Sequence, residues 1–241
     1  ADMKTLVIGD LHGLFGHLQT LIQQKRPDLV VQLGDFGYWP DDETSYGLKR
    51  MITYRLREKA GIHCPIHFID GNHEHHPALR ERQAHLHPDN PLAPVEVAPE
   101  VYWMPRGASM TLPDGRVAVF LGGAKSVDAP LRIEGDDWFP EEVLTRDALA
   151  GLPESADIVF SHTAPTRFNI LERFKDRRPP KEWDLSPDKS MAVLDEAFDR
   201  LRPRLWYFSH FHGVSQGVTD GCRWFELDMA GHQDWWTWLE E

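Results

Sequence analysis

Short apolar runs alternate with longer amphipathic stretches along the first third of the chain. Residues 4–9, 28–34 and 65–70 have the length and composition of buried strands. Residues 14–24 and 44–60 show the period of amphipathic helices. This order of strand and helix predicts consecutive βα units.

The middle of the chain, residues 88–123, is broken by Pro and Gly into short β-prone pieces. Within it, Pro113-Asp114-Gly115 is a turn signal that predicts a hairpin. Further helices are predicted at residues 140–149 and 187–201, and further strands at 157–161, 205–209, 213–219 and 222–227. Without a repeat or a low-complexity linker, the pattern predicts one domain over residues 1–241, folded as a layered α/β sandwich.

Five of the predicted strands run directly into polar clusters. The residues there that could ligate a metal or react are Asp10, His12, Asp35, Asn72, His73, His162, His210 and His212. Ligands of open α/β sheets bind beyond the carboxyl ends of the strands, so we expect these side chains to converge. The Asp10-x-His12 motif alone is weak, because such a triplet arises by chance in a chain with 13 His, whereas the quartet Gly71-Asn72-His73-Glu74 seldom does. A similar pair, His85 and His87, is interpreted as solvent-facing.

Composition narrows the class of protein. The chain has 241 residues, of which 41% are hydrophobic and 27% charged, as in a globular domain. No apolar run reaches the roughly 18 residues of a membrane span, and no secretion signal is apparent, so a cytoplasmic protein is expected. The net charge of −12 disfavours long nucleic acid as a partner. Cys64 and Cys222 are predicted to be buried free thiols. The oligomeric state stays open.

The residue types favour a pair of divalent cations. Two such ions about 3.5–4 Å apart need a bridging oxygen ligand, and Asp35 is the natural bridge. Mixed nitrogen and oxygen ligands suit Mn, Fe, Zn, Co or Ni better than Mg or Ca, and we favour Mn. Two carboxylates leave the pair of ions with surplus positive charge, and the neutral Asn72 preserves it. An anionic phosphate can therefore dock there.

In chain order the motifs are Asp10-x-His12, Gly34-Asp35, Gly71-Asn72-His73-Glu74, His162 and His210-x-His212. They resemble the ordered motifs of the calcineurin-like metallophosphoesterases, and the chain is similar to the small bacterial and phage members. The resemblance covers residues 10–212. It implies a four-layer α-β-β-α sandwich, in which two mixed sheets are flanked by helices and a dinuclear metal site lies at the strand carboxyl ends.

The resemblance also implies roles for single residues. One metal would be held by Asp10, His12 and His212, and the other by Asn72, His162 and His210, with Asp35 bridging. Asn72 and His73 would contact the phosphate, and His73 would protonate the leaving oxygen. Asp35 and His73 are thus the expected catalytic residues, and a hydroxide bridging the metals would attack phosphorus in line.

The chain departs from the protein Ser/Thr phosphatase branch after Asp35. That branch continues as Gly-Asp-x-Val-Asp-Arg-Gly, whereas here Tyr38 and Trp39 stand at the Asp and Arg positions. This argues against a protein phosphatase and leaves the partner that orients His73 unassigned. A cation that binds phosphate must then come from elsewhere or be unnecessary.

Three cations are candidates for substrate binding. Lys125 and Arg132 follow a glycine pair, and Arg167 lies in a basic stretch over residues 166–181. The first segment is equally well interpreted as a structural turn, and the second as a solvated loop. Trp235, Trp236 and Trp238 are predicted to fasten the C-terminal tail to the domain, with stacking on a nucleobase or a partner as the alternative.

The favoured function is hydrolysis of a small phosphorylated substrate, preferentially a phosphodiester or nucleotide. The alternatives are a phosphomonoesterase or protein-phosphatase-like enzyme, a nuclease, and a scaffold that kept the fold but lost the chemistry, as has the retromer subunit that resembles this family. Metal content separates the scaffold from the enzymes.

Overall fold

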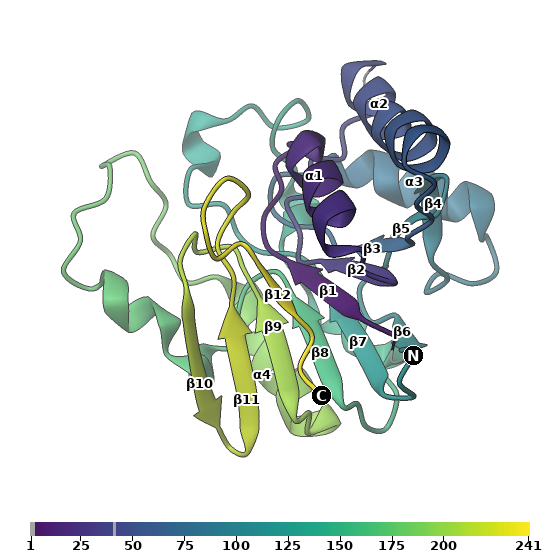
Figure 1. Ribbon diagram of the computed structural model, residues 1–241. Coiled ribbons are helices and arrows are strands. Elements are labelled where there is room, and N and C mark those ends of the chain that lie inside the picture. Colours follow the sequence, from purple (N-terminus) through teal and green to yellow (C-terminus); the bar gives the residue numbers. More distant parts are fainter. Residues whose placement is uncertain (1–2, 41) are drawn as a thin grey trace.

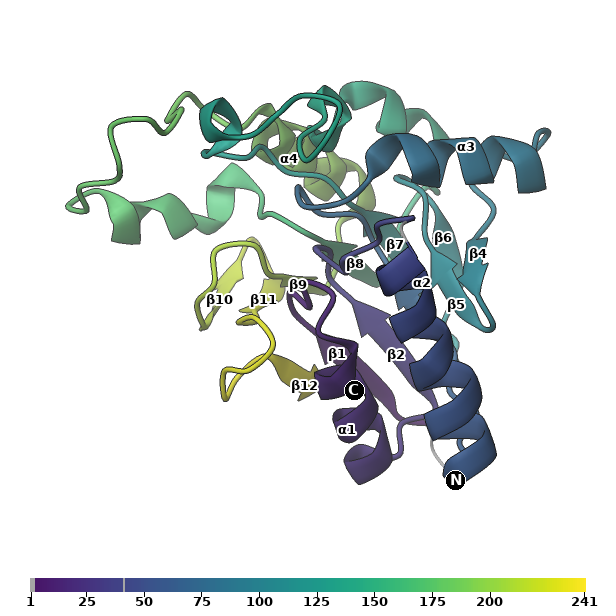
Figure 2. The same ribbon diagram turned by 90° about the horizontal axis from the view of Figure 1, so that it is seen from above.

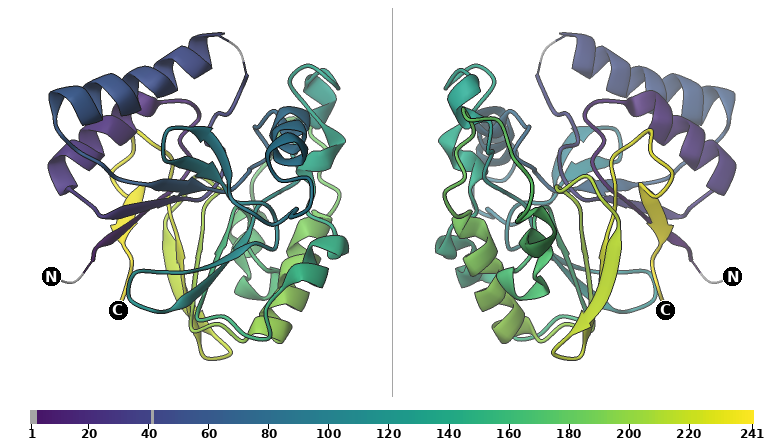
Figure 3. Two further views of the ribbon diagram at one scale, coloured as in Figure 1. Left: turned by 90° about the vertical axis from the view of Figure 1, so that its right-hand side faces the viewer. Right: turned by 90° about the vertical axis from the view of Figure 1, so that its left-hand side faces the viewer.

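The computed structural model describes residues 3–40 and 42–241. Two six-stranded sheets pack against each other, and helices cover their outer faces (Figure 1). Figure 3 shows helices on the two opposite outer sides of the paired sheets. The predicted α-β-β-α sandwich of two mixed sheets is therefore confirmed.

The first sheet has the strand order β12-β1-β2-β3-β5-β4. Its strands are β1 (Thr5–Ile8), β2 (Leu29–Gln32), β3 (Ile66–Phe68), β4 (Val95–Ala98), β5 (Val101–Trp103) and β12 (Trp236–Trp238). The strands β1, β2, β3 and β5 are parallel, and antiparallel β12 and β4 form the two edges.

The second sheet repeats this plan with the order β10-β11-β9-β8-β7-β6. Its strands are β6 (Ser109–Thr111), β7 (Val117–Leu121), β8 (Ile158–Ser161), β9 (Leu205–Phe208), β10 (Ser215–Thr219) and β11 (Cys222–Glu226). The inner four strands are parallel, and the edges β10 and β6 are antiparallel. The hairpin predicted at residues 113–115 joins β6 to β7.

Helices α1 and α2 lie outside β1 and β2, and α4 lies beyond β7 and β8 (Figure 2). The α-helices are α1 (Phe15–Lys25), α2 (Asp42–Lys49), α3 (His76–Leu86) and α4 (Lys189–Leu201). A π-helical stretch, η1 (Arg50–Lys59), continues α2. The 3₁₀ turns are η2 (Ala129–Leu131), η3 (Pro140–Glu142), η4 (Arg146–Gly151), η5 (Thr166–Phe168) and η6 (Ile170–Phe174).

The central strands are mostly apolar because both of their faces are buried. Successive side chains of a strand point to opposite faces. In β1, Leu6 and Ile8 join the core under α1, while Val7 joins the core between the two sheets. Phe120 and Phe160 of the second sheet meet Val7 in that central core. Continuous apolar runs are typical of parallel strands covered on both sides.

The predicted helix at residues 140–149 is wrong. The segment forms the separate turns η3 and η4. The side chain of Arg106 donates to the backbone carbonyls of Glu141, Glu142 and Val143, and so occupies acceptors that a continuous helix would use. Because these carbonyls are satisfied by a side chain, the segment gains little from becoming helical.

The helix α3 and the strand β12 were not predicted. Helix α3 buries only His76 and Leu79, so its sequence lacks a broad apolar stripe. The strand β12 lies in the tryptophan-rich tail and pairs with β1, which fastens the tail to the domain as expected. The tail was not, however, predicted to form a strand. Both cysteines are buried and free, as predicted. In the described part of the chain, no helix combines the length and the apolar composition that crossing a bilayer requires.

Candidate metal centre

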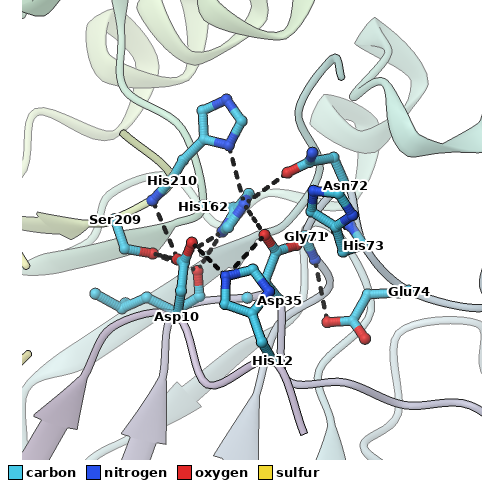
Figure 4. A network of polar contacts seen from close by, with 12 residues as sticks. Asp10, His12, Asp35, Gly71, Asn72, His73, Glu74, His162, Ser209 and His210 are labelled. Carbon is cyan, nitrogen blue, oxygen red and sulfur yellow. Dashed lines mark hydrogen bonds and ion pairs between the residues drawn. The ribbon is translucent and has the colours of Figure 1, made fainter. Parts of the chain in front are cut away.

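The chemistry-bearing residues predicted from the sequence converge at the carboxyl ends of five strands (Figure 4). In the first sheet, Asp10 follows β1, Asp35 follows β2, and Asn72 follows β3. In the second sheet, His162 follows β8 and His210 follows β9. The site therefore lies where the ends of both sheets meet.

One group of ligand atoms gathers around Asp10. Its Oδ2 lies 2.9 Å from His212 Nε2 and 3.4 Å from His12 Nε2. The ligand atoms of these three residues all lie within 4.8 Å of one another. His12 Nε2 is buried and has no hydrogen-bond partner among the described residues. An unpartnered buried nitrogen beside a carboxylate fits a metal ligand.

A second group gathers around His162. Its Nε2 lies 3.1 Å from Asn72 Oδ1, 3.2 Å from His210 Nδ1 and 3.5 Å from Asp35 Oδ2. Its Nδ1 donates to the carbonyl of Leu33 at 2.7 Å, so Nε2 is the nitrogen that faces the site. Asp10, Asp35 and His162 also bring their ligand atoms within 4.8 Å of one another.

The two groups share carboxylates. Asp10 belongs to both groups. Asp35 Oδ2 lies 3.5 Å from His162 Nε2 of the second group and 4.0 Å from His12 Nε2 of the first group. Two carboxylates between two clusters of nitrogen ligands are a donor set suited to divalent transition metals.

The electrostatics of the site favour a cation. Asp10 and Asp35 are buried, and within residues 3–40 and 42–241 they pair only with histidines, not with Lys or Arg. Burial opposes ionisation of Asp10, but His162 and the other histidines outweigh it and hold the pKa of this carboxyl well below its usual range. For His162, burial is outweighed by Asp35 and Asp10, which raise its pKa to about 10. Buried carboxylates that draw positive charge this strongly fit a site for cations.

For His210 and His73, burial determines the direction of the pKa shift. Burial, reinforced by the charge of His162, lowers the pKa of His210 to about 4. Burial also lowers the pKa of His73, although Asp35 acts in the opposite direction. The His210 ring is therefore neutral near pH 7, and a neutral imidazole has a lone pair for a metal.

Four of the candidate ligands have left-handed backbones. The φ angles are 50° at His12, 50° at Asp35, 72° at His210 and 49° at His212. Residues other than glycine seldom adopt this conformation, and such strain clusters at functional sites. The tight backbone geometry that turns each strand end into the site is thus maintained at an energetic cost.

Glycines make room for the ligands at two positions. A Cβ on Gly34 would lie 2.4 Å from His162 Nδ1, and one on Gly71 would lie 2.1 Å from Asp35 Oδ1. Neither distance is compatible with a side chain. The Gly34-Asp35 and Gly71-Asn72 pairs of the sequence therefore have a direct steric reason.

A cavity of about 540 Å³ adjoins the ligand cluster. It is lined by His12, Gly13, Phe15, Gly37, Trp39, Gly47, His73, Arg132 and Asp137. Its lining thus includes the candidate ligand His12, the expected acid His73 and the candidate cation Arg132, together with the rings of Phe15 and Trp39. Trp39 also packs edge-on against His75, with ring centroids 5.7 Å apart.

The structure does not bring the other two candidate cations to this cavity. Lys125 Nζ donates to the carbonyls of Asp184 and Ser186, at 2.9 and 2.7 Å. Arg167, in η5, donates to Asp195 and Asp199 of α4. Both side chains form hydrogen bonds that link separate segments of the chain, so we do not assign them to substrate binding.

Three supporting residues were given no role by the sequence. Ser209 donates its hydroxyl hydrogen to Asp10 Oδ1 at 2.6 Å. The Glu74 carboxyl accepts from the backbone N–H groups of residues 36–38, and burial raises its pKa to about 8. Ser126 accepts a hydrogen bond from Asn72 Nδ2 at 2.9 Å. Position beside a motif was a signal for Ser209 and Glu74, whereas Ser126 stood out only as the neighbour of Lys125, and nothing in the sequence linked it to Asn72.

Two mixed sheets with a histidine and carboxylate cluster at their joint define an α/β sandwich that carries a candidate metal centre. The chain belongs to the calcineurin-like phosphoesterase family, whose family model matches residues 3–214. Hydrolysis of phosphate esters with divalent metal ions is the general chemistry of this family.

Individual relatives are more distant. The lariat debranching enzyme of Schizosaccharomyces pombe is 26% identical over 233 residues, which cover 87% of this chain and 48% of that protein. The chain therefore spans about half the length of this curated relative. One crystal structure aligns with 94% of this chain and 90% of its own, at 15% identity and a TM-score of 0.53, and shares the fold. A dimetal phosphatase from Danio rerio covers 95% of this chain, with 88% of its own length aligned, at 12% identity and a TM-score of 0.48.

Proposed function

We propose that this chain hydrolyses small phosphodiesters or nucleotides, using two divalent transition-metal ions. Manganese is the favoured metal, with iron, zinc, cobalt or nickel as alternatives. One ion would be held by Asp10, His12 and His212, the other by Asn72, His162 and His210, and Asp35 would bridge them. When bound, the ions would offset charge on the phosphoryl group and acidify a water molecule.

The observation that carries this proposal is the pair of overlapping ligand groups around buried carboxylates that lack a Lys or Arg partner in the described part of the chain. A structural ion pair would need a permanent cation at that depth. The orphaned His12 Nε2 supports the same conclusion.

The chain's own residues would bind and orient the substrate. Arg132 and His73 line the cavity beside the ligands. The Arg132 guanidinium offers N–H groups to phosphate oxygens, and His73 delivers a proton to the leaving oxygen. Asp35 Oδ1 accepts the backbone N–H of His73 at 2.8 Å, which holds this loop against the bridging carboxylate.

The shape of the cavity supports an aromatic group on the substrate. Its volume of about 540 Å³ is within the usual range of small-molecule sites. Trp39 and Phe15 provide ring surfaces on which a nucleobase can stack. The net charge of −12 disfavours long nucleic acid. The fission-yeast relative is named for debranching lariats, but this chain spans only about half of that protein, so we do not transfer its substrate.

The test is turnover by metal-stripped protein that has been reloaded with Mn²⁺. The substrates are bis-p-nitrophenyl phosphate and p-nitrophenyl phosphate, and Asp35→Asn is the matched variant. We expect metal-dependent turnover that favours the diester and falls by at least about 100-fold in the variant, because a bridging ligand is lost. Preference for the monoester would favour a phosphomonoesterase. Absence of turnover and of retained metal would favour a scaffold.

A further inference from the structure

We propose that Ser126 and Glu142 are positioning residues that fix which way the Asn72 carboxamide faces, so that its oxygen points into the candidate metal centre. The inference rests on the proposed function, because it assigns a task toward the metal ions. It concerns residues that neither the motifs nor the cavity lining includes.

The three side chains form a buried chain of hydrogen bonds. Asn72 Nδ2 lies 2.9 Å from Ser126 Oγ, which lies 2.6 Å from Glu142 Oε1. The Glu142 carboxylate also accepts the backbone N–H of Ser126 through Oε2. Asn72 is 5% exposed, and Ser126 and Glu142 are each 1% exposed, so water does not compete for these bonds.

Counting hydrogens settles the orientation of the amide. A serine hydroxyl has one hydrogen to donate and two lone pairs to accept. Arg132 Nη1, which is only a donor, uses one lone pair at 2.9 Å. Burial raises the pKa of Glu142, while the hydrogen bonds from Ser126 and the charge of Arg132 act in the opposite direction. The ionised carboxylate is only an acceptor, so it takes the hydroxyl hydrogen. The second lone pair must therefore face a donor, and the amide nitrogen of Asn72 is that donor.

The consequence appears at the other end of the carboxamide. With Nδ2 on Ser126, Oδ1 faces the site and lies 3.1 Å from His162 Nε2. An amide oxygen is a metal ligand, whereas an amide nitrogen has no lone pair to offer. Ser126 also joins this ligand to Arg132 on the cavity wall. One hydroxyl thus connects the candidate metal centre to the side chain that we expect to contact phosphate.

Glu142→Gln is the sharpest perturbation of this network. The glutamine oxygen has to accept the N–H of Ser126, so its NH₂ group faces Ser126 Oγ. The hydroxyl hydrogen must then turn toward Asn72, and the carboxamide has to flip. We expect the affinity for the second Mn²⁺ to fall by about 10–100-fold, as for other residues that orient metal ligands. Ser126→Ala removes the constraint without reversing it and is expected to cause a smaller loss.

Glu226→Gln is the matched control. Glu226 is also 1% exposed and is bonded to an arginine and a serine, Arg173 and Ser215, but to none of the predicted ligands. Apo forms of the wild type and of the three variants would be titrated with Mn²⁺ by calorimetry. The loaded proteins would be compared by electron paramagnetic resonance, in which a coupled Mn pair differs from isolated ions. Excess Mn²⁺ should restore kcat in Glu142→Gln.

The supporting result is two Mn²⁺ ions in the wild type and in Glu226→Gln, but one tight and one weakened ion in Glu142→Gln. Equal affinities in Glu142→Gln and the wild type would overturn the inference while leaving the proposed function intact. Equal losses in Glu142→Gln and Glu226→Gln would overturn it as well, because they indicate general destabilisation. A wild type that binds no Mn²⁺ would overturn both proposals. If Glu142→Gln does not fold, Ser126→Ala decides by the same titration.

Discussion

Arg106 forms a buried ion pair that joins the end of β3 to the segment carrying Glu142. Its Nε and Nη2 donate to Asp70 Oδ2 at 3.0 and 2.8 Å, and it also donates to the carbonyls of residues 141–143. The Asp70 side chain is 1% exposed and that of Arg106 is 11% exposed. The substitution Arg106→Met keeps much of the apolar stem but leaves a buried carboxylate with Trp103 Nε1 as its remaining close donor in the described structure.

The size of the effect follows from this burial. Removing one partner of a buried ion pair costs about 3–5 kcal/mol, because the other charge stays behind without compensation. This is a large share of a total stability of roughly 5–15 kcal/mol. For a chain of this length we expect the midpoint of thermal unfolding to fall by roughly 6–20 °C. Urea unfolding at pH 7, followed by tryptophan fluorescence, would measure the free energy directly.

An exposed pair of the same chemistry provides the control. Arg116 donates to Asp114 from Nε at 2.9 Å and from Nη2 at 2.6 Å, but these side chains are 24% and 42% exposed. Arg116→Met should therefore cost at most about 1 kcal/mol. If Arg106→Met costs no more than Arg116→Met, burial does not set the strength of the pair and the reasoning is refuted.

Two further outcomes are expected. Burial lowers the pKa of His67 to about 4, from an ordinary value of 6.5, so the unfolded chain takes up a proton in this window while the native chain does not. The free energy of unfolding should therefore fall by about 2 kcal/mol between pH 7 and pH 5. The variant His67→Phe can keep the stacking on Tyr102. It should remove that part of the pH dependence, as measured by urea titrations at several pH values. Trp39→Ala should raise KM about tenfold for cyclic AMP, by loss of stacking, and leave kcat and the KM for glycerol phosphate unchanged. An equal rise in KM for both substrates would argue against a base-stacking role.

The strand ends were predictable because each buried strand is continuous in sequence and stops at a polar residue. Asp10, Asp35 and His162 each follow such a run directly. The candidate ligands could therefore be selected from local pattern together with the rule that parallel strands end at a common edge. Only the structure shows that Asp10, as well as Asp35, stands between the two groups.

The supporting contacts were not predictable, because they join segments that are far apart in sequence. Ser126 and Asn72 are separated by 54 positions, and Arg106 meets Asp70 across 36. Lys125 is a further example. Its sequence context, a glycine pair and a neighbouring serine, suggested a phosphate contact, yet its ammonium group is held by the backbone of residues 184–186. A side chain's direction depends on which segment packs beside it, and no local pattern records that.

The location of the site at the joint of the two sheets has a consequence for biosynthesis. The backbone N–H of His210 reaches Asp10 across 200 positions, and Ser209 reaches it across 199. A nascent chain that has emerged only as far as β7 holds Asp10, Asp35 and Asn72 but none of the histidines of the second sheet. Such a fragment has both carboxylates and His12 but lacks His162, His210 and His212. The candidate centre is therefore completed only after β9 and the residues that follow it have been synthesised, and a chain cut short before β9 is left without the complete set of candidate ligands.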